Sequence, residues 1–330
     1  MDREKNLKSL KLLEVKNLNV TIEYNGKTLT LVDDLNFYVK QGEIFGIVGE
    51  SGCGKSLTSK SIMRILGEKF TPHGTICYLG KNLLQLSEKE MCAMRGNDIS
   101  IVFQDAMAAL NPLKKIGKQV EECLRIHKKF SFNQKNEIME RVYTTLLECG
   151  IRNPQEICKK YPHELSGGQR QRVIIAMAVI CNPALIICDE CTTALDLRTQ
   201  LTIIKLLKKL NKEKNMSIMF VSHDIALVEA ICHRVMVMYA GRSVEIIEGS
   251  LKNALHPYTR ALYSMLFSMD IKDKMLPYVP GTVLPADKRT RDKCYFGDRC
   301  KYYNNCHENN LVEIEKGHFV ACEKVINQCL

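Results

Sequence analysis

The chain has 330 residues, of which 45% are hydrophobic and 25% charged, and its formal net charge at pH 7 is +10. This composition excludes a disordered or fibrous protein, and the length leaves room for one large or two modest domains. The basic residues are scattered rather than grouped, which is typical of a solvated surface and does not by itself indicate a nucleic-acid or membrane-binding protein.

The sequence shows neither an export signal nor a membrane span. The N-terminal residues MDREKNLKSLK lack an apolar stretch, and the best candidate span, residues 173–188, is interrupted by Asn182-Pro183. We therefore expect a soluble protein with reduced cysteines, which must dock if it works at a membrane.

Strand and helix patterns alternate along the first 250 residues. Strands are predicted within 12–48, with turns at Asn25-Gly26 and Gln41-Gly42, and the last of them is the short apolar strand 44–48. The later predicted elements are a helix at 55–66, helices throughout 106–160, a helix at about 168–180, a strand at 185–188, a helix at 198–211 and a strand at 217–221. This order predicts a parallel-sheet α/β core with a helical subdomain.

The composition changes after about residue 250, where prolines and cysteines become frequent and long apolar runs disappear. We predict a core domain over residues 1–250, with its helical subdomain at about 106–167, and an appended module over residues 251–330.

The sequence GESGCGKS fits the pattern G-x-x-x-x-G-K-[ST] between a predicted strand and a predicted helix. In such a loop, backbone N–H groups and the helix N-terminus surround phosphate oxygens. Lys55 is expected to reach the β- and γ-phosphates, and the Ser56 hydroxyl to ligate Mg²⁺. The expected nucleotide contacts are Gly49, Glu50, Ser51, Gly52, Cys53, Gly54, Lys55, Ser56 and Leu57.

The apolar strand Leu185–Cys188 delivers two carboxylates, Asp189 and Glu190, to the sheet edge where ligands bind in α/β proteins. Asp189 is expected at the Mg²⁺ site, and Glu190 is placed to orient or polarise the attacking water. A solvated Asp-Glu pair is the simpler alternative, which the nearby phosphate loop disfavours.

A second anion-binding pattern, Leu165 followed by Ser166, Gly167, Gly168 and Gln169, lies at the start of a predicted helix. A second phosphate site in one chain makes sense if two chains face each other and each offers this helix start to the other's ATP. A plain helix cap would need nothing beyond Ser166.

These motifs resemble those of the nucleotide-binding subunits of ABC transporters, in the family's order over roughly residues 12–250. GESGCGKS is similar to the Walker A loop, LIICDE to the Walker B strand, LSGGQ to the signature and Ala194-Leu195-Asp196 to the D-loop. The resemblance implies that Gln104 is the Q-loop glutamine, which senses Mg²⁺ and contacts the membrane partner, and that His223 is the switch histidine near the γ-phosphate. The implied fold is a P-loop NTPase core, with a RecA-like parallel-sheet subdomain, an antiparallel β subdomain and a helical subdomain.

Three segments of the chain resemble the oligopeptide/dipeptide importer branch, whose relatives also serve nickel and metal-chelate uptake. These segments are RGNDISIVFQDAMAALNP, YPHELSGGQRQRVIIAMA and HPYT. The resemblance implies a peripheral ATPase at the cytoplasmic face of the membrane, which drives import of peptides or, as the alternative, of nickel or a metal chelate. The implied partners are a second ABC ATPase subunit, two transmembrane permease subunits and an external substrate-binding protein, and no nucleic acid is implied.

Three positions depart from the family pattern. Cys191 and Ala106 stand where the family usually has proline, and Ile22 stands where an aromatic residue is expected to stack on adenine. Tyr24 lies two residues further along the same strand face and is expected to take over the stacking.

Four cysteines of the tail, Cys294, Cys300, Cys306 and Cys322, have the spacing C-x5-C-x5-C-x15-C. Four thiolates suit an iron–sulfur cluster or a structural Zn²⁺, and the spacing alone leaves the metal open. The family resemblance implies a [4Fe–4S] cluster, and a structural role is expected because the tail lies outside every catalytic motif. An empty, reduced tail is a further alternative, Cys329 is spare, and His307 and His318 are possible alternate ligands.

Three other classes remain as alternatives. A soluble ABC ATPase acting on ribosomes or DNA usually has tandem cassettes or a long coiled-coil insertion, and neither is visible here. A regulatory ATP-binding module would hydrolyse ATP poorly. An exporter reading is weaker, since no transmembrane domain is fused and the tail is importer-like.

Overall fold

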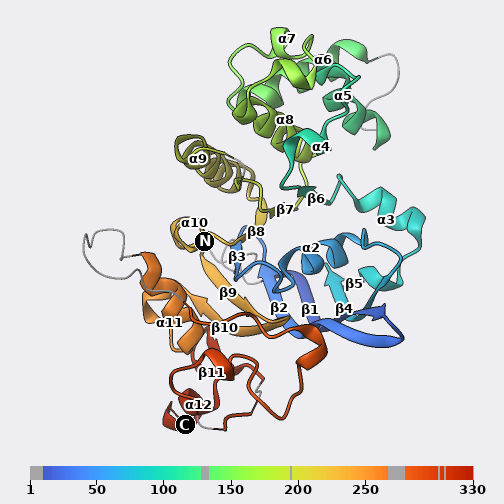
Figure 1. The fold of residues 1–330 in the computed structure, drawn as a ribbon. Helices are drawn as coiled ribbons and strands as arrows, with labels where there is room; N and C mark the ends of the chain where they lie inside the picture. The colour runs from blue at the N-terminus through green and yellow to red at the C-terminus, as the bar shows by residue number, and fades with distance from the viewer. Residues whose placement is uncertain are drawn as a thin grey trace. The chain divides into compact units, whose positions relative to one another are not determined.

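The computed structural model describes residues 10–127, 134–193, 195–266, 279–303, 305–307 and 310–329. The chain divides into two compact units, which are considered separately (Figure 1). The first unit contains Met1–Leu10, Lys40–Glu43 and Gln85–Met219, and the second contains Lys11–Val39, Ile44–Leu84 and Phe220–Leu330. Strand β8 (Ser217–Ser222) begins in the first unit and ends in the second. The predicted domain boundary near residue 250 stays a prediction.

The first unit is mainly helical. Two parallel strands, β6 (Ile99–Val102) and β7 (Leu185–Asp189), pair with Ile99 opposite Leu185. Its helices are α3 (Glu88–Met94), α4 (Ala106–Ala109), α5 (Ile116–Ile126), α6 (Lys135–Glu148), α7 (Pro154–Ile157), η2 (Pro162–Glu164), α8 (Gly167–Val179) and α9 (Leu197–Lys214). Within residues 106–127 and 134–160, the regular elements are helices alone, as predicted.

Helix α8 forms the core of this unit, packed against α4, α5, α6 and β6 (Figure 1). Apolar residues recur at every fourth position on its neighbours, so that each helix presents one buried stripe. On α5 this stripe is Ile116, Val120 and Leu124, and on α6 it is Ile138, Val142 and Leu146. Burial of each such side chain stabilises the unit by roughly 1.5–3 kcal/mol.

The second unit contains an antiparallel sheet in the order β2-β1-β4-β5. Its strands are β1 (Lys11–Tyr24), β2 (Lys27–Lys40), β4 (Phe70–Tyr78) and β5 (Lys81–Asn82). Asn25 and Gly26 join β1 to β2 with φ angles of 50° and 73°. Positive φ at both positions is the geometry of a type I′ hairpin turn, for which Asn-Gly is the preferred pair.

A second sheet of this unit has the strand order β11-β12-β10-β9-β3. Strand β3 runs parallel to β9, and the remaining pairs are antiparallel. The strands are β3 (Ile44–Val48), β9 (Arg234–Tyr239), β10 (Arg242–Glu248), β11 (Val312–Glu315) and β12 (His318–Val320). Strands β11 and β12, near the end of the chain, therefore extend the sheet that contains β3.

Short helices complete the second unit. They are α2 (Lys55–Met63), η1 (Leu83–Gln85), α10 (Ile225–Ile231), η3 (Leu251–Asn253), α11 (Pro257–Ser264), η5 (Ala286–Lys288), η6 (Gly297–Arg299) and α12 (Glu323–Cys329). The predicted helix at 55–66 ends earlier, because Arg64 adopts a left-handed φ of 50° and caps α2. In the described residues, no helix combines the length and apolar character that crossing a bilayer requires.

Candidate functional site

The predicted phosphate-binding loop, residues 49–56, connects buried strand β3 to helix α2 in the second unit. A Cβ at Gly49 would lie 2.2 Å from the backbone oxygen of Met238 on β9, so only glycine fits there. Gly52 and Gly54 have φ angles of 78° and 103°, which side-chain-bearing residues rarely adopt. Because Gly54 is the N-cap and the first turn holds no acidic residue, the positive end of α2 is uncompensated there.

Lys55 closes this loop into a ring. Its ammonium donates hydrogen bonds to the backbone oxygens of Gly49, at 2.8 Å, and Glu50, at 3.0 Å. The neighbouring Cys53 is fully buried, and burial raises the pKa of its thiol, so it remains an uncharged wall of the loop. A cation on a ring of glycine-rich backbone is a site for a polyphosphate.

Glu50 contacts residues from the end of the chain. Its backbone N–H donates to the Tyr258 hydroxyl at 3.0 Å. Its carboxylate accepts two hydrogen bonds from the Arg299 guanidinium, at 2.6 and 2.9 Å. The sequence pattern placed Glu50 in the loop but gave no sign of these partners.

His223 and Tyr24 also belong to the second unit. His223 is exposed after β8, and Asp224 next to it caps α10 by accepting from the N–H groups of Ala226 and Leu227. Tyr24 ends β1 with 60% of its surface exposed, whereas Ile22 is half-buried and pairs with Phe70 on β4. An accessible aromatic ring is therefore present at Tyr24.

Asp189 and Glu190 lie in the first unit, at the end of β7. Asp189 is 5% exposed, and Glu190 is half-buried with a left-handed φ of 50°. This conformation is unfavourable for a residue with a side chain, and such residues often occur at functional sites. The thiol of Cys191, where a proline is usual, is fully buried.

Gln104 is exposed between β6 and α4 in the same unit. Asp105 caps α4 with hydrogen bonds from the N–H groups of Met107 and Ala108. Ala106 is the first residue of this helix, where proline is well tolerated, so its replacement by alanine leaves the helix start intact.

The sequence LSGGQ forms the N-terminus of α8. The Ser166 hydroxyl accepts from the N–H of Gln169 at 3.3 Å, and the Gln169 side chain accepts from the N–H of Ser166 at 3.0 Å. This capping box gives Gln169 as well as Ser166 a structural role. A Cβ at Gly168 would lie 2.9 Å from the Thr199 methyl carbon on α9. No acidic residue occupies the first turn, so this helix end favours an anion. Of the predicted D-loop, Ala194 lies outside the described residues.

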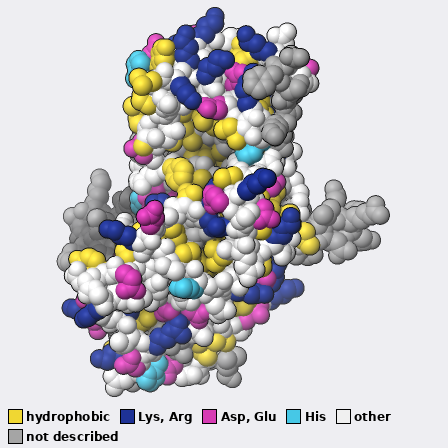
Figure 2. Space-filling model, turned by 90° about the vertical axis from the view of Figure 1, so that its right-hand side faces the viewer, with side chains coloured by type: hydrophobic (Ala, Val, Ile, Leu, Met, Phe, Trp, Pro, Cys, Tyr) yellow, Lys and Arg dark blue, Asp and Glu magenta, His cyan; other side chains and the backbone are white. Residues whose placement is uncertain are grey.

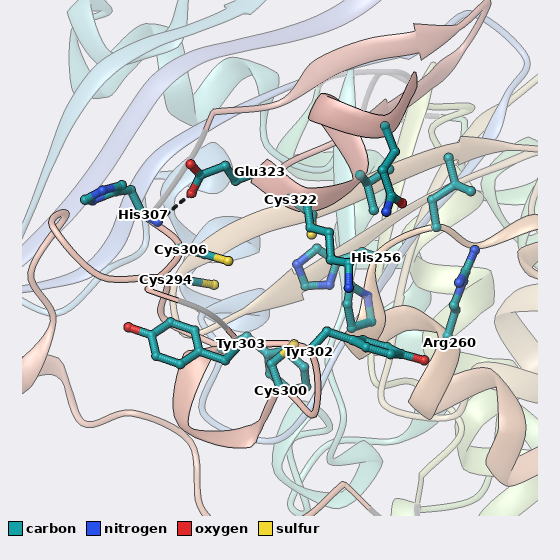
Figure 3. Close-up of a pocket in the computed structure, with 16 residues that line it drawn as sticks. His256, Arg260, Cys294, Cys300, Tyr302, Tyr303, Cys306, His307, Cys322 and Glu323 are labelled. Atoms are coloured by element: carbon teal, nitrogen blue, oxygen red, sulfur yellow. Dashed lines mark hydrogen bonds between the residues drawn. The ribbon is translucent and has the colours of Figure 1, made fainter. Parts of the chain in front are cut away.

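Cys294, Cys300, Cys306 and Cys322 line one cavity of about 260 Å³ in the second unit. The N–H of Cys294 donates to the oxygen of Cys306 at 2.9 Å, and Figure 3 shows both sulfur atoms directed into the cavity. Burial raises the pKa of the Cys322 thiol. His307 also lines the cavity, whereas Cys329 does not.

Among the described residues, no three Cys, His, Asp or Glu side chains are close enough together to hold a single metal ion. The four thiols surround a common space without converging on one point. His318 is engaged elsewhere, since its Nε2 lies 2.8 Å from the Glu245 carboxylate.

Two family models match this chain: "ABC transporter" over residues 32–193, and "Oligopeptide/dipeptide transporter, C-terminal region" over residues 245–306. A probable peptide ABC transporter ATP-binding protein of Sinorhizobium fredii, y4tR, is 40% identical over 98% of this chain and 97% of its own. The dipeptide transport ATP-binding protein DppD of Bacillus subtilis is 43% identical over 88% of this chain and 87% of its own. The chain belongs to the ABC transporter ATP-binding proteins of the oligopeptide/dipeptide importer family.

Solved structures agree with this assignment of the ABC ATPase. The ATP-binding cassette MJ0796, in a dimeric structure bound to ADP and Pi, has a TM-score of 0.64 and 29% identity, covering 72% of this chain and 98% of its own. CbiO1 of Clostridium perfringens, part of the transporter complex CbiONQ, has a TM-score of 0.61 and 31% identity, covering 71% of this chain and 87% of its own. The predicted family, α/β cassette fold and ATPase class are confirmed.

Sequence reasoning on this ABC ATPase missed Tyr258 and Arg299. They approach Glu50 across 208 and 249 residues of chain, so no local spacing relates them to the loop. Both fall within the segment 245–306 that the C-terminal family model matches.

Proposed function

We propose that this ABC ATPase binds MgATP on its phosphate-binding loop, closes on a second cassette and powers peptide import by hydrolysis. The observation that carries the proposal is the loop itself. Gly49 fits against β9 only without a side chain, and Lys55 closes the loop through two backbone oxygens. A loop built this way presents N–H groups and a fixed cation to the β- and γ-phosphates.

Each motif residue has a proposed part in binding. The loop from Gly49 to Leu57 surrounds the phosphates with backbone N–H groups, except for the Glu50 N–H, which donates to the Tyr258 hydroxyl, and Tyr24 stacks on the adenine. Ser56, Gln104 and Asp189 are oxygen-bearing side chains of the kind that Mg²⁺ prefers, and they would hold this ion. When bound, Mg²⁺ neutralises phosphate charge.

The proposed hydrolytic residues are Glu190 and His223. Glu190 orients the attacking water, and its left-handed backbone, which turns the chain after β7, is consistent with such a role. His223 is exposed at the end of β8 and is proposed to contact the γ-phosphate region.

The signature residues Ser166, Gly167, Gly168 and Gln169 are proposed to serve the ATP of the opposite cassette, which is either a second copy of this chain or a homologous subunit. Support comes from the α8 N-terminus, whose first turn has no acidic residue. Further support comes from MJ0796, whose solved structure with ADP and Pi is dimeric.

We propose two transmembrane permease subunits and an external substrate-binding protein as further partners, with the ATPase at the cytoplasmic membrane face. Peptides are the proposed cargo, because the relatives y4tR and DppD are named for peptide and dipeptide transport. Nucleic acid is not a proposed partner. Among the described residues on the face in Figure 2, Lys and Arg side chains are interspersed with Asp and Glu.

The four-cysteine cavity is proposed to hold a [4Fe–4S] cluster. The donor set fits this group, because the four cysteines line one cavity of about 260 Å³ and thiolates are the usual ligands of such clusters. Such a cluster would be held by Cys294, Cys300, Cys306 and Cys322, and its chemistry there would be to crosslink the loops that carry them.

The test uses the purified full-length chain, with equilibrium binding of MgATP followed by turnover with permeases in liposomes. Lys55→Ala should weaken nucleotide binding at least about tenfold, while Lys60→Ala on the same helix leaves it unchanged. Glu190→Gln should retain binding and lose about 10²–10⁴-fold in turnover. An unaltered chain that does not bind Mg-nucleotide would refute the proposal.

A further inference from the structure

Glu50 is the second residue of the phosphate-binding loop, and it is the point at which the C-terminal part of the chain holds that loop. We propose that Arg299 is a positioning residue for nucleotide binding, which fixes the loop through the Glu50 carboxylate. The inference rests on the proposed role of the loop in binding MgATP, and it gives the C-terminal region a part in that binding.

The ion pair has a two-point geometry. Nη1 of Arg299 lies 2.6 Å from Oε2 of Glu50, and Nη2 lies 2.9 Å from Oε1. The Arg299 side chain is 4% exposed and the Glu50 side chain 25% exposed. A bidentate pair fixes the orientation of both groups, and a buried guanidinium is weakly screened by salt.

Arg299 is itself held on the opposite side. Its Nε donates to the oxygen of Pro280 at 2.6 Å, and Nη2 also donates to the oxygen of Val279 at 3.1 Å. Its guanidinium lies 5.6 Å from the centre of the Tyr239 ring on β9. The Arg299 side chain therefore connects the C-terminal segment to the loop through hydrogen bonds on both sides.

Tyr258 on α11 provides a second attachment. Its hydroxyl accepts from the backbone N–H of Glu50, and its ring packs edge-on against Tyr239 and at a tilt against Phe296. Tyr258 is fully buried, so this hydroxyl has little freedom to move. The backbone oxygen of Glu50 accepts from Lys55 at 3.0 Å. Glu50 is thus held through its N–H, its oxygen and its carboxylate.

Two effects on the nucleotide follow from this arrangement. First, a loop that is already fixed needs less ordering when the triphosphate arrives, so affinity increases. Second, Arg299 compensates the negative charge of Glu50, which would otherwise stand beside the phosphates and repel them. Loss of the arginine removes both effects, whereas loss of the Glu50 charge removes only the attachment.

This asymmetry defines the experiment. Arg299→Gln should weaken binding of a fluorescent ATP analogue with Mg²⁺ by about tenfold and raise KM with a smaller change in kcat. Glu50→Gln should weaken binding less, and the double variant should resemble Glu50→Gln instead of showing the product of both losses. Arg299→Lys keeps the charge but not the two-point contact, and should be intermediate.

Arg291→Gln is the matched control. Arg291 belongs to the same C-terminal region and pairs with an acidic residue, Asp33, but not with the loop. The affinity of the Arg291→Gln variant for the ATP analogue should remain within about twofold of the affinity of the unaltered chain. Amide exchange over Gly49–Ser56 in the nucleotide-free protein should be faster in Arg299→Gln and unchanged in Arg291→Gln.

Unchanged affinity and unchanged loop exchange in Arg299→Gln would overturn the inference, and so would fully multiplicative losses in the double variant. If Arg299→Gln does not fold, Glu50→Gln and the exchanged pair Glu50→Arg/Arg299→Glu decide the question on the same measurements. If the unaltered chain binds no nucleotide, the proposed function fails, and the exchange measurement still tests the attachment of the loop.

Discussion

The carboxylate of Asp33 on β2 lies 3.0 Å from the guanidinium of Arg242 on β10, and the two side chains are only 9% and 5% exposed. Arg291 and the Tyr295 hydroxyl bind the same carboxylate, at 2.6 and 3.0 Å. One ionised group therefore joins an early strand to the C-terminal region.

Because this carboxylate is ionised in the folded protein, the free energy of unfolding should decrease at acid pH. Burial raises the pKa of Asp33, but the bonds from Arg291, Arg242 and Tyr295 outweigh it, and the net pKa is below the ordinary 3.8. A lowered pKa stabilises the fold above the unfolded-state value, and the contribution is lost as pH falls through the folded-state value. We expect Asp33→Asn to lower the free energy of unfolding by about 2 kcal/mol at pH 7, with the difference shrinking toward pH 3 in urea titrations. A difference independent of pH would contradict this.

Gly49→Ala should abolish nucleotide binding. The added Cβ would stand 2.2 Å from the Met238 oxygen, a backbone atom that cannot yield without separating β3 from β9. Gly67→Ala is the control, because a Cβ there meets only a Phe70 ring carbon at 3.9 Å. Calorimetric titration with MgATP compares the two, and retained affinity in Gly49→Ala would show that the loop can move.

Substitutions of Ser166 can distinguish its role in capping α8 from its proposed role in binding the ATP of an opposite cassette. Aspartate caps helices as well as serine does, so Ser166→Asp should preserve thermal stability, whereas Ser166→Ala should cost about 1 kcal/mol. If the α8 N-terminus receives a neighbour's γ-phosphate, the new carboxylate repels it. ATP turnover of the assembled transporter should then fall at least tenfold in Ser166→Asp, roughly the effect of 1.4 kcal/mol. Turnover that follows stability alone would exclude the cross-cassette role.

If the cysteine cavity holds the proposed iron–sulfur cluster, replacing a cysteine that lines the cavity should cause loss of iron, and replacing a cysteine outside it should not. Cys294→Ser or Cys306→Ser should remove the visible absorption of an iron–sulfur cluster and most of the iron and sulfide from anaerobically purified protein. Cys329→Ser should retain them, since this cysteine lies outside the cavity. Stoichiometric zinc, or no metal at all, in the unaltered chain would contradict the cluster.

Local patterns in the sequence were sufficient to predict the local structure of the proposed nucleotide-binding motifs. The loop glycines, the carboxylates at the end of β7 and the start of α8 are each set by residues a few positions apart, and each lies at the predicted turn, strand end or helix end. The spacing of the tail cysteines likewise predicted one group made of Cys294, Cys300, Cys306 and Cys322, and all four line one cavity.

Contacts between distant parts of the chain were not predictable in this way. Arg299 is one of 47 basic residues, and nothing in its local sequence distinguishes it from a solvated one. The left-handed backbone of Glu190 also lacks a local signal, because glycine or asparagine would be expected there. The contacts of Arg299 depend on which distant segments of the chain pack together, which periodicity does not specify.

The pairing of β10 with β12 has a consequence for any attempt to exchange C-terminal regions between transporters. The backbone of Glu245–Ile247 is covered by residues 318–320, and the buried Glu245 carboxylate accepts from the N–H groups of Leu255 and His256. A chain cut between these partners would expose a bare strand edge, which recruits strands from other molecules and promotes aggregation. A chimaera should therefore be joined ahead of β9, so that the sheet edge and its cover come from one parent.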